Sequence, residues 1–397
     1  MTNRSLTLLL AALAMIAPVA TDTYLPAIPE VARHFHVTDD AVQLTLSIFL
    51  FAQSAMTLFY GALTDGFGRR PVIIVALGVF SLASLGAALA PAFSWLLVFR
   101  ALQGLSAAAG IVVAQAVVRD RFVGAHAHRT ISHIMMVFVI APALAPVIGG
   151  YINAIFGWRL IFAMLAVLGV MLFAVCLRGL PESLLPAART HFSAGSVLRG
   201  YAHALNDRSF VFAIVANGCL FGGFALYISS AAKFVTGILH LSETGFAWLF
   251  MPLIAGSFIG SALSARFAHR LAIRTVALGG LWVAGAGAAL NIAYSGMFPA
   301  SVPWALVPLF VFSFGASLAM PAMTSIAQSK TVTGVGLRAG LQNFVQLLLF
   351  ALIAGVVAPM VFNSALYLAL GMGAAVLLAA VFWSMSVSGR YAMALSR

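Results

Sequence analysis

Two oppositely charged residues of this 397-residue chain lie inside long apolar segments, where an ionised side chain is costly unless it faces a cavity or a partner. Asp22 falls near the end of the first segment, and Arg100 near the start of the fourth. At about 1.5 Å per helical residue, both would lie roughly 8–9 Å below one membrane surface. We expect Asp22 to carry a proton, Arg100 to tune it, and Glu30 to be a secondary proton site. A static buried salt bridge is the alternative.

A charged loop between the second and third apolar segments could act as a conformational latch. Its sequence, from Gly61 to Arg70, is GALTDGFGRR. The glycines permit a tight reversal of the chain, and the carboxylate of Asp65 can face the positive N-terminal end of a neighbouring helix. The alternative is that the arginines only anchor the loop at the membrane boundary. The predicted latch consists of Gly61, Asp65, Gly68, Arg69, Arg70 and, at the same level after the fourth segment, Asp120.

The fifth apolar segment carries two prolines and two glycines that predict a hinge. Pro142 and Pro146 remove two backbone donors four residues apart, and Gly149 and Gly150 allow close contact with another helix. Such a segment could bend during a conformational change. A kinked helix without a gating role is the alternative.

Polar residues within the otherwise apolar segments are candidates to line a substrate cavity. Hydrogen bonds between helices would explain the same residues equally well, so both interpretations stay open. The candidates are Tyr24, Gln53, Gln103, Gln115, Asn217, Tyr227, Asn291, Gln342, Asn343 and Gln346. Two of them, Gln342 and Gln346, are four residues apart and therefore share one helix face.

These residues must be positioned by membrane helices. The chain is 63% hydrophobic and only 8% charged, which excludes a water-soluble fold. Each charge-free interval is long enough for a span of about 20 residues, and the last two are each long enough for two spans. The intervals are 5–21, 41–64, 71–99, 101–118, 130–158, 160–177, 209–232, 244–265, 275–329 and 339–389. The predicted fold is an all-α integral membrane protein with twelve transmembrane helices.

The distribution of basic residues predicts how these spans are oriented. When the segments between spans are numbered alternately, one set holds 17 of the 21 basic residues. Basic residues are retained in the cytoplasm, so both termini are expected there. The net charge of +12 is then explained by topology, and we expect no nucleic-acid partner.

The longest polar stretch, 178–208, is predicted to be a cytoplasmic linker between six-helix bundles at 1–177 and 209–397. An offset of 200 aligns residues 62–70 with 262–270, and four of these nine positions are identical. The match favours two pseudo-symmetric halves around a central cavity. The second copy of the loop has Ala265 where the first has Asp65, so it lacks the latch acid.

Other classes of protein fit this sequence less well. A polytopic membrane enzyme would need a nucleophile with a base, paired carboxylates or a metal cluster. Ser317 is a possible nucleophile, but the last four spans contain no histidine that could act as its base. The pairs His34/His36 and His126/His128 are too sparse for a metal site. No lysine follows a glycine, so the phosphate-binding G-K-[ST] loop is absent. We expect no metal and no cofactor, with a proton gradient as the energy source.

Several motifs together resemble the major facilitator superfamily. The loop from Gly61 to Arg70 resembles its G-x-x-x-D-x-x-G-R-R motif. The stretches 21–29, 100–104 and 141–150 resemble signatures of drug/proton antiporters with twelve spans. The amino-acid sequence of the first stretch is similar to that of the bicyclomycin/chloramphenicol-resistance (Bcr/CflA) branch.

This resemblance implies a function and a location. It implies a proton-coupled antiporter in the bacterial inner membrane that exports small amphipathic drugs, phenicol-like or bicyclomycin-like and neutral to weakly cationic, by alternating access. The expected partners are a small-molecule substrate, protons and membrane lipid, and the protein is expected to be a monomer. A metabolite transporter of the same fold is the alternative, and a membrane enzyme is disfavoured.

Overall fold

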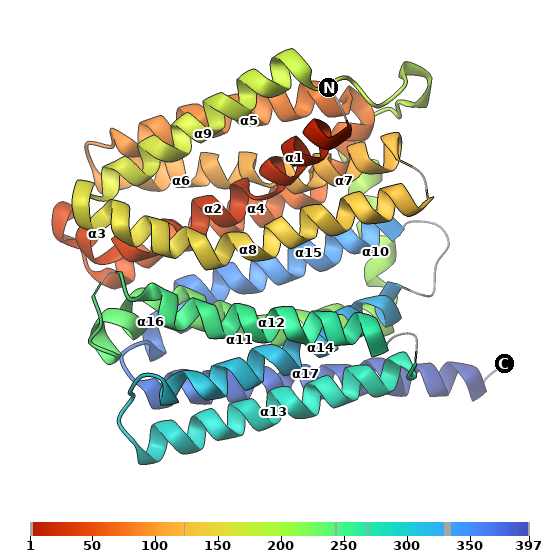
Figure 1. Cartoon of the computed structure of the whole chain (residues 1–397). Coiled ribbons are helices and arrows are strands. Elements are labelled where there is room, and N and C mark those ends of the chain that lie inside the picture. The colour runs from red at the N-terminus through yellow and green to blue at the C-terminus, as the bar shows by residue number, and fades with distance from the viewer. Residues whose placement is uncertain (1–2, 123, 243, 268–269, 329–334, 396–397) are drawn as a thin grey trace. The chain divides into compact units, whose positions relative to one another are not determined.

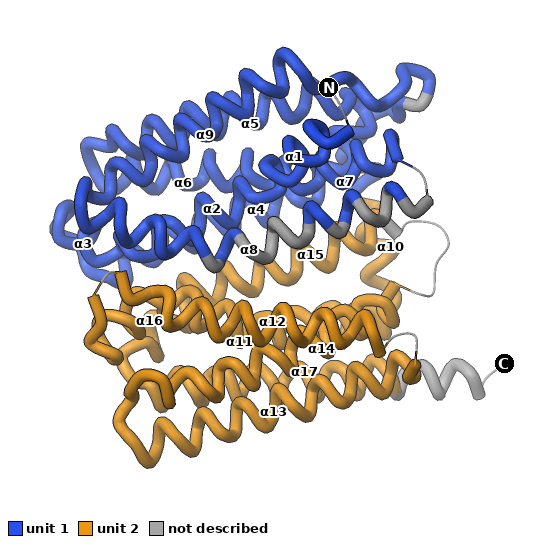
Figure 2. The backbone as a smooth tube through the Cα atoms, in the orientation of Figure 1, with its two compact units in different colours: residues 1–197 blue, residues 198–397 orange. Residues whose placement is uncertain are grey.

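The computed structural model describes residues 3–122, 124–242, 244–267, 270–328 and 335–395, which form helices and connecting segments without a β-strand. The chain divides into two compact units, residues 1–197 and 198–397 (Figure 2). Residues 178–208, predicted as the linker, contain the end of one span, a short 3₁₀ turn and a helix that crosses the boundary between the units.

The first span of unit 1 is interrupted several times. Its pieces are α1 (Asn3–Ala14), α2 (Ile16–Asp22), the 3₁₀ turn η1 (Leu25–Ala27) and α3 (Ile28–Phe35) (Figure 1). Pro26 and Pro29 are the second residues of η1 and α3. A proline lacks a backbone N–H and is favoured at such a helix start, so the two prolines explain why the helix restarts there.

The other spans of unit 1 are longer and more regular. Thr38 caps the second span, because its hydroxyl oxygen accepts a hydrogen bond from the N–H of Ala41 at 3.3 Å. α6 and α7 together make the fourth span. The elements are α4 (Asp39–Phe67), α5 (Arg69–Ala88), α6 (Phe93–Ala107), α7 (Ala109–Arg121), α8 (Gly124–Phe156), α9 (Trp158–Gly179) and η2 (Pro186–Ala188).

Unit 2 contains the remaining helices, except that residues 194–197 at the start of the first of them belong to unit 1. α13 packs along α14 and α17, and α11 also packs along α17. Gly280 of α13 faces Gly315 of α14, and a side chain on either would collide with the backbone of the other helix. The elements are α10 (Ala194–Leu205), α11 (Arg208–Ser229), the π-helix η3 (Lys233–Ile238), α12 (Phe246–Phe267), α13 (Ile273–Met297), η4 (Trp304–Leu306), α14 (Val307–Gln328), α15 (Val335–Leu352), η5 (Ile353–Val357), α16 (Ala358–Val361) and α17 (Ala365–Leu395).

The number of spans agrees with the sequence. Within the described ranges, 11 helices are long and apolar enough to cross a membrane, and a shorter apolar stretch at Leu144–Phe156, the end of α8, supplies the twelfth. The predicted twelve-helix fold is confirmed.

Candidate functional site

Asp22 lies where the first span is interrupted. α2 ends at Asp22, and the next turn, η1, begins only at Leu25. Asp22 is 5% exposed, and its carboxylate forms no hydrogen bond or ion pair within the part of the chain that the structure describes. A buried carboxylate without a partner is costly as an anion, so this position requires a proton or a cation.

Arg100 of α6 is fully buried near the same interruption. Its Nη1 donates to the carbonyl of Ala20 at 3.2 Å, and its Nε donates to the carbonyl of Thr45 at 3.3 Å. Its guanidinium carbon lies 4.3 Å from the centroid of the Phe49 ring, a cation–π contact. Arg100 thus bonds to the backbone two residues before Asp22 and not to its carboxylate. The static salt bridge, one of the two interpretations of the sequence, is not formed.

Tyr24 and Gln103 belong to the hydrogen-bonded network around Arg100. Gln103 accepts from Nη1 of Arg100 at 3.0 Å and donates to the hydroxyl of Ser84 at 2.8 Å, while Thr45 donates to the hydroxyl of Tyr24 at 3.0 Å. Tyr24 and Gln103 are both completely buried, so they tie helices together in this structure. Thr45 and Ser84 were missed because hydroxyl residues are common in apolar helices.

The other candidates of unit 1 have different surroundings. Gln53 of α4 is buried, and Gln115 of α7 is half-buried. Glu30 is half-buried in the first turn of α3, beyond the interruption that follows Asp22. These three residues do not join the Arg100 network within the described part of the chain.

The junction between α4 and α5 brings most of the predicted latch residues together. The stretch from Gly61 to Arg70, predicted as a loop, is helical except at Gly68, which alone separates α4 from α5. The guanidinium of Arg69 forms ion pairs with Asp65 and, at 3.1 Å from Nε, with Asp120 at the end of α7. Gly68 has a φ of 99°, a left-handed conformation that favours glycine. Arg70 does not reach Asp120, because its Nη2 donates to the carbonyl of Leu177 at 2.8 Å. Gly61 faces open space, so a larger side chain would fit there and packing does not require a glycine at this position.

Glu182 is a member of this cluster that sequence reasoning missed. Its carboxylate accepts hydrogen bonds from the backbone N–H groups of Arg69 at 3.0 Å and Arg70 at 3.3 Å, and so caps the N-terminus of α5. Next to it, the hydroxyl of Ser183 donates to Asp120 at 2.7 Å. Further along, the N–H of Thr190 donates to the carbonyl of Asp65 at 3.1 Å. The segment after α9 is therefore fastened onto the latch loop.

The predicted hinge segment is one continuous helix, α8, through both Pro142 and Pro146. Gly149 and Gly150 are buried. A side chain at Gly149 would collide with the backbone carbonyl of Thr23, directly after Asp22. The glycine thus allows α8 to touch the interruption of the first span.

Three predicted cavity residues of unit 2 meet in one cluster of amides. Asn217 of α11 donates to the hydroxyl of Thr324 at 3.0 Å, and its side-chain oxygen accepts from Gln346 at 2.7 Å. Gln342 also donates to Thr324 at 2.7 Å and accepts from Gln328 at 3.4 Å. The cluster joins α11, α14 and α15 and contains no charged group. Thr324 and Gln328 were not predicted.

The remaining candidates of unit 2 lie apart from this cluster. Asn291 of α13 donates to the hydroxyl of Tyr227 at 2.6 Å in a buried pair, so both residues link helices. Asn343 is exposed. In the first turn of α15, Arg338 forms an ion pair with Asp207 at 3.2 Å. Asp207 also caps the N-terminus of α11.

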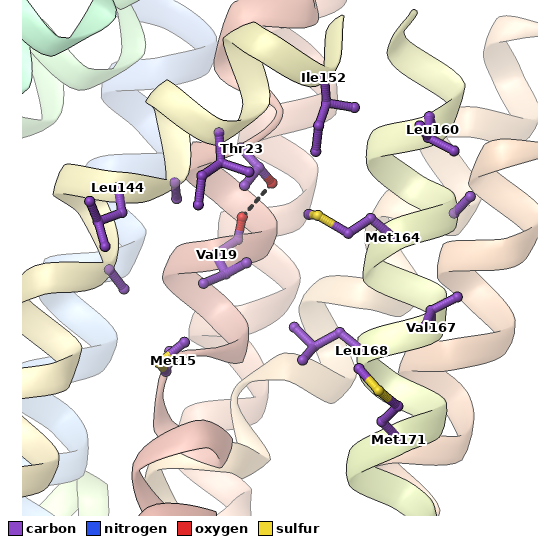
Figure 3. A pocket seen from close by; sticks show the side chains of 14 residues that line it. Met15, Val19, Thr23, Leu144, Ile152, Leu160, Met164, Val167, Leu168 and Met171 are labelled. Atoms are coloured by element: carbon purple, nitrogen blue, oxygen red, sulfur yellow. Dashed lines mark hydrogen bonds between the residues drawn. The ribbon is translucent and has the colours of Figure 1, made fainter. Parts of the chain in front are cut away.

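An apolar cavity of about 680 Å³ lies between the first span, α8 and α9 in unit 1 (Figure 3). Met15, Val19 and Thr23 form its wall on the first span, and the hydroxyl of Thr23 is bonded back to the carbonyl of Val19 at 2.6 Å. The cavity therefore offers an apolar surface next to the interruption that holds Asp22. Among the described residues, no three His, Cys, Asp or Glu side chains come together to hold a metal ion.

Comparisons with known proteins agree with this architecture. A model described as "Major Facilitator Superfamily" matches residues 10–352. The chain is 28% identical to "Bicyclomycin resistance protein homolog" of Haemophilus influenzae, over 70% of this chain and 71% of the relative. It is 29% identical to "Multidrug resistance protein D" of Escherichia coli K12, over 86% of both chains. The crystal structure of a D-xylose-proton symporter matches with a TM-score of 0.73 at 16% identity, over 96% of this chain and 98% of that one.

Proposed function

Because this chain belongs to the major facilitator superfamily, it is a transporter and not an enzyme, and we propose that it exports small amphipathic drugs in exchange for protons. The observation that carries this proposal is Asp22, a buried carboxylate without a partner at the interruption of the first span. Relatives named for bicyclomycin resistance and multidrug resistance support the class of substrate.

The surroundings of Asp22 suit a group that alternates between two protonation states. As an anion it needs a cation, and Arg100 is held two residues away by the carbonyl of Ala20. A small shift of the segment around the interruption would let the guanidinium exchange that carbonyl for the carboxylate. Asp22 would carry a proton in one state and pair with Arg100 in the other. Glu30 is the next candidate for the proton site.

The chemistry of the candidate site favours neutral or weakly cationic substrates. The amide cluster around Asn217 offers hydrogen bonds without charge, and the cavity beside Thr23 offers an apolar surface. Phenicol-like and bicyclomycin-like compounds combine these two properties. A metabolite transporter of the same fold would use the same groups on a different cargo. We further propose that the protein acts as a monomer in the bacterial inner membrane, with both termini in the cytoplasm.

Transport into everted vesicles with an imposed pH gradient tests the function, using a panel of phenicols, bicyclomycin and small metabolites. We expect drug accumulation that collapses with the gradient and is insensitive to ATP. Asp22→Asn should abolish this accumulation, while Asp40→Asn, the same change at an exposed site at the start of α4, should leave it intact.

Substrate-induced proton release from the purified protein separates the coupling residue from the cargo. Asp22→Asn should release no proton when drug binds. Release as large as in the wild type would assign the proton to another group. Accumulation of metabolites but not drugs would favour the alternative cargo, and chemically altered product would contradict transport.

A further inference from the structure

The end of α3 meets the start of α9 through a contact between a histidine and an arginine. Nη1 of Arg159, the second residue of α9, lies 3.0 Å from Nε2 of His34, in the last turn of α3. Figure 1 shows α3 beside the turn from α8 into α9. With both termini in the cytoplasm, as the charge distribution predicts, the end of the first span faces the outside of the cell. His34 is exposed there and can meet external protons.

The contact fixes the protonation state of the His34 ring. An arginine side chain can only donate hydrogen bonds, so Nε2 of His34 accepts, and the hydrogen of the neutral ring sits on Nδ1. A protonated ring has no acceptor left, and it would place a second positive charge 3.0 Å from the guanidinium. Histidine is also the side chain whose charge ordinarily changes between pH 5 and 8. This contact therefore forms only while His34 is neutral.

Arg159 is held in place by two other contacts. Its Nη2 donates to the carbonyl of Ala90 at 3.1 Å, and its guanidinium carbon lies 4.5 Å from the centroid of the Trp158 ring. No carboxylate pairs with Arg159 within the described ranges. When His34 gains a proton, the repulsion therefore falls on His34 and on the helix that carries it.

Glu30 offers the protonated ring another partner. It precedes His34 by four residues, so the two side chains are neighbours on one face of α3. Glu30 is half-buried, and its Oε1 lies 3.3 Å from the position that a Cβ on Gly157 would take at the start of α9. A positive His34 would be drawn to this carboxylate. The titratable and charged side chains on the elements around His34 are Glu30, Arg33, His36, Asp39, Asp40 and Arg159, and in the part of the chain that the structure describes only Arg159 bonds to His34.

The contact also belongs to the segment that follows the interruption at Asp22. The rings of His34 and Phe35 each lie 5.5 Å from the ring of Trp158, so the last turn of α3 is docked on the start of α9. At its other end, α3 begins directly after η1, three residues beyond the end of α2. Release of α3 from α9 would loosen the outer side of this interruption.

We propose that His34 is an external proton-binding site of this transporter. A proton that binds Nε2 replaces the hydrogen bond from Arg159, turns the ring toward Glu30 and releases α3 from α9. This inference rests on the proposed exchange of drugs for protons and adds an outer step to it. Protons outside the cell loosen the helix that separates them from Asp22.

Hydrogen exchange of the purified protein in lipid nanodiscs, without drug or pH gradient, tests this site. We expect the backbone amides of α3 in the wild type to exchange about fivefold faster at about pH 5.5 than at about pH 7.5, after correction for the intrinsic rates, since two like charges at this spacing repel even near water. His34→Gln should exchange equally at both pH values, because its amide oxygen still accepts from Arg159 and binds no proton.

His36→Asn is the matched control, because it removes another exposed histidine of the same segment that does not bond to an arginine among the described residues. Asparagine tolerates the left-handed backbone of this position, where φ is 52°. We expect it to keep the wild-type response to pH. A pH response of α3 that disappears in His36→Asn and persists in His34→Gln would overturn the proposal.

Arg159→Gln separates proton binding from a merely structural contact. Without the positive charge, protonation of His34 should no longer drive α3 away, so this variant should also exchange equally at both pH values. Asp22→Asn should keep the wild-type response, and loss of the response in Asp22→Asn would overturn the proposal, as would its absence from the wild type. A protein that shows the response but moves no drug would support this site and contradict the proposed function.

Discussion

The backbone N–H of Arg69 donates a 3.0 Å hydrogen bond to the carboxylate of Glu182, 113 residues further along the chain. The same carboxylate accepts from the N–H groups of Ser183 and Leu184. Glu182 therefore holds the start of α5 and its own segment in one piece. Because Arg69 also pairs with Asp65 and Asp120, any movement of this cluster must carry the segment after α9 with it.

We predict that Glu182→Gln weakens unit 1 and slows transport. The amide keeps a hydrogen-bond acceptor but loses the negative charge at the N-terminus of α5, a loss of about 1 kcal/mol. The midpoint of thermal unfolding in detergent should fall, and Glu182→Asp should recover part of the loss. An unchanged midpoint and transport rate for Glu182→Gln would show that the contact is incidental.

Asp65 and Asp120 should behave as one unit, because they share the guanidinium of Arg69. Asp65→Asn should reduce the rate of transport, since coupling of this kind typically amounts to about 1–3 kcal/mol. Adding Asp120→Asn should then cost less than it does alone. The check is a double-mutant cycle on initial transport rates, with Asp40→Asn as a control. If Asp65→Asn transports at the wild-type rate at normal expression, the loop only anchors the helices at the membrane boundary and is not a latch.

The amide cluster of unit 2 should contribute to stability. Asn217→Leu leaves the side-chain amide of Gln346 without its acceptor, and Thr324 keeps only the hydrogen bond from Gln342, so we expect a loss of about 1–3 kcal/mol. Asn343→Leu changes an exposed amide of α15 and should leave the unfolding midpoint unchanged. Because the cluster contains no acid or base, its contribution should be the same from pH 5 to 8. Thermal unfolding of both variants across this range measures this, and a loss that varies with pH would contradict it.

The predicted topology can be read from a cysteine at Ser193, which is exposed next to the latch loop. The two native cysteines, Cys176 and Cys219, are buried or half-buried and can be removed as background. In intact cells, Ser193→Cys should resist a membrane-impermeant thiol reagent and react after the cells are opened. Reaction in intact cells would reverse the orientation.

The sequence predicted the spans well because a membrane helix is recorded in one continuous run of apolar residues. The candidate site was harder to predict. Two of the three hydrogen-bond acceptors of Arg100 are the backbone carbonyls of Ala20 and Thr45, and every residue type has a backbone carbonyl, so no motif could reveal them. Glu182 directly follows Pro181 in the segment after α9, where nothing in the local sequence marks it, and only the tertiary fold brings it to Arg69. Tyr24 and Gln103 were predicted to line a cavity or to link helices, and their burial depends on which helices surround them.

The interruption at Asp22 shows the same limit. Pro26 and Pro29 mark a restart of the helix, but they do not reveal that Asp22 itself closes α2. Directly after that position, at Thr23, the first span touches α8 at Gly149, a contact between segments far apart in the sequence. A contact between residues so far apart in the sequence cannot be predicted from the local sequence pattern.

The two backbone acceptors of Arg100 are synthesised before Arg100 itself. Ala20 and Thr45 belong to the first two spans that leave the ribosome, and Arg100 arrives with the fourth. An unpaired arginine at the centre of a helix opposes insertion by about 2.5–3.5 kcal/mol, and Arg100, nearer the start of its span, opposes it by less. When α6 enters the membrane in the intact chain, both carbonyls are already there to receive the guanidinium. We therefore expect a chain without its first two spans to insert the fourth less well than the intact chain does, as measured in a glycosylation-mapping assay.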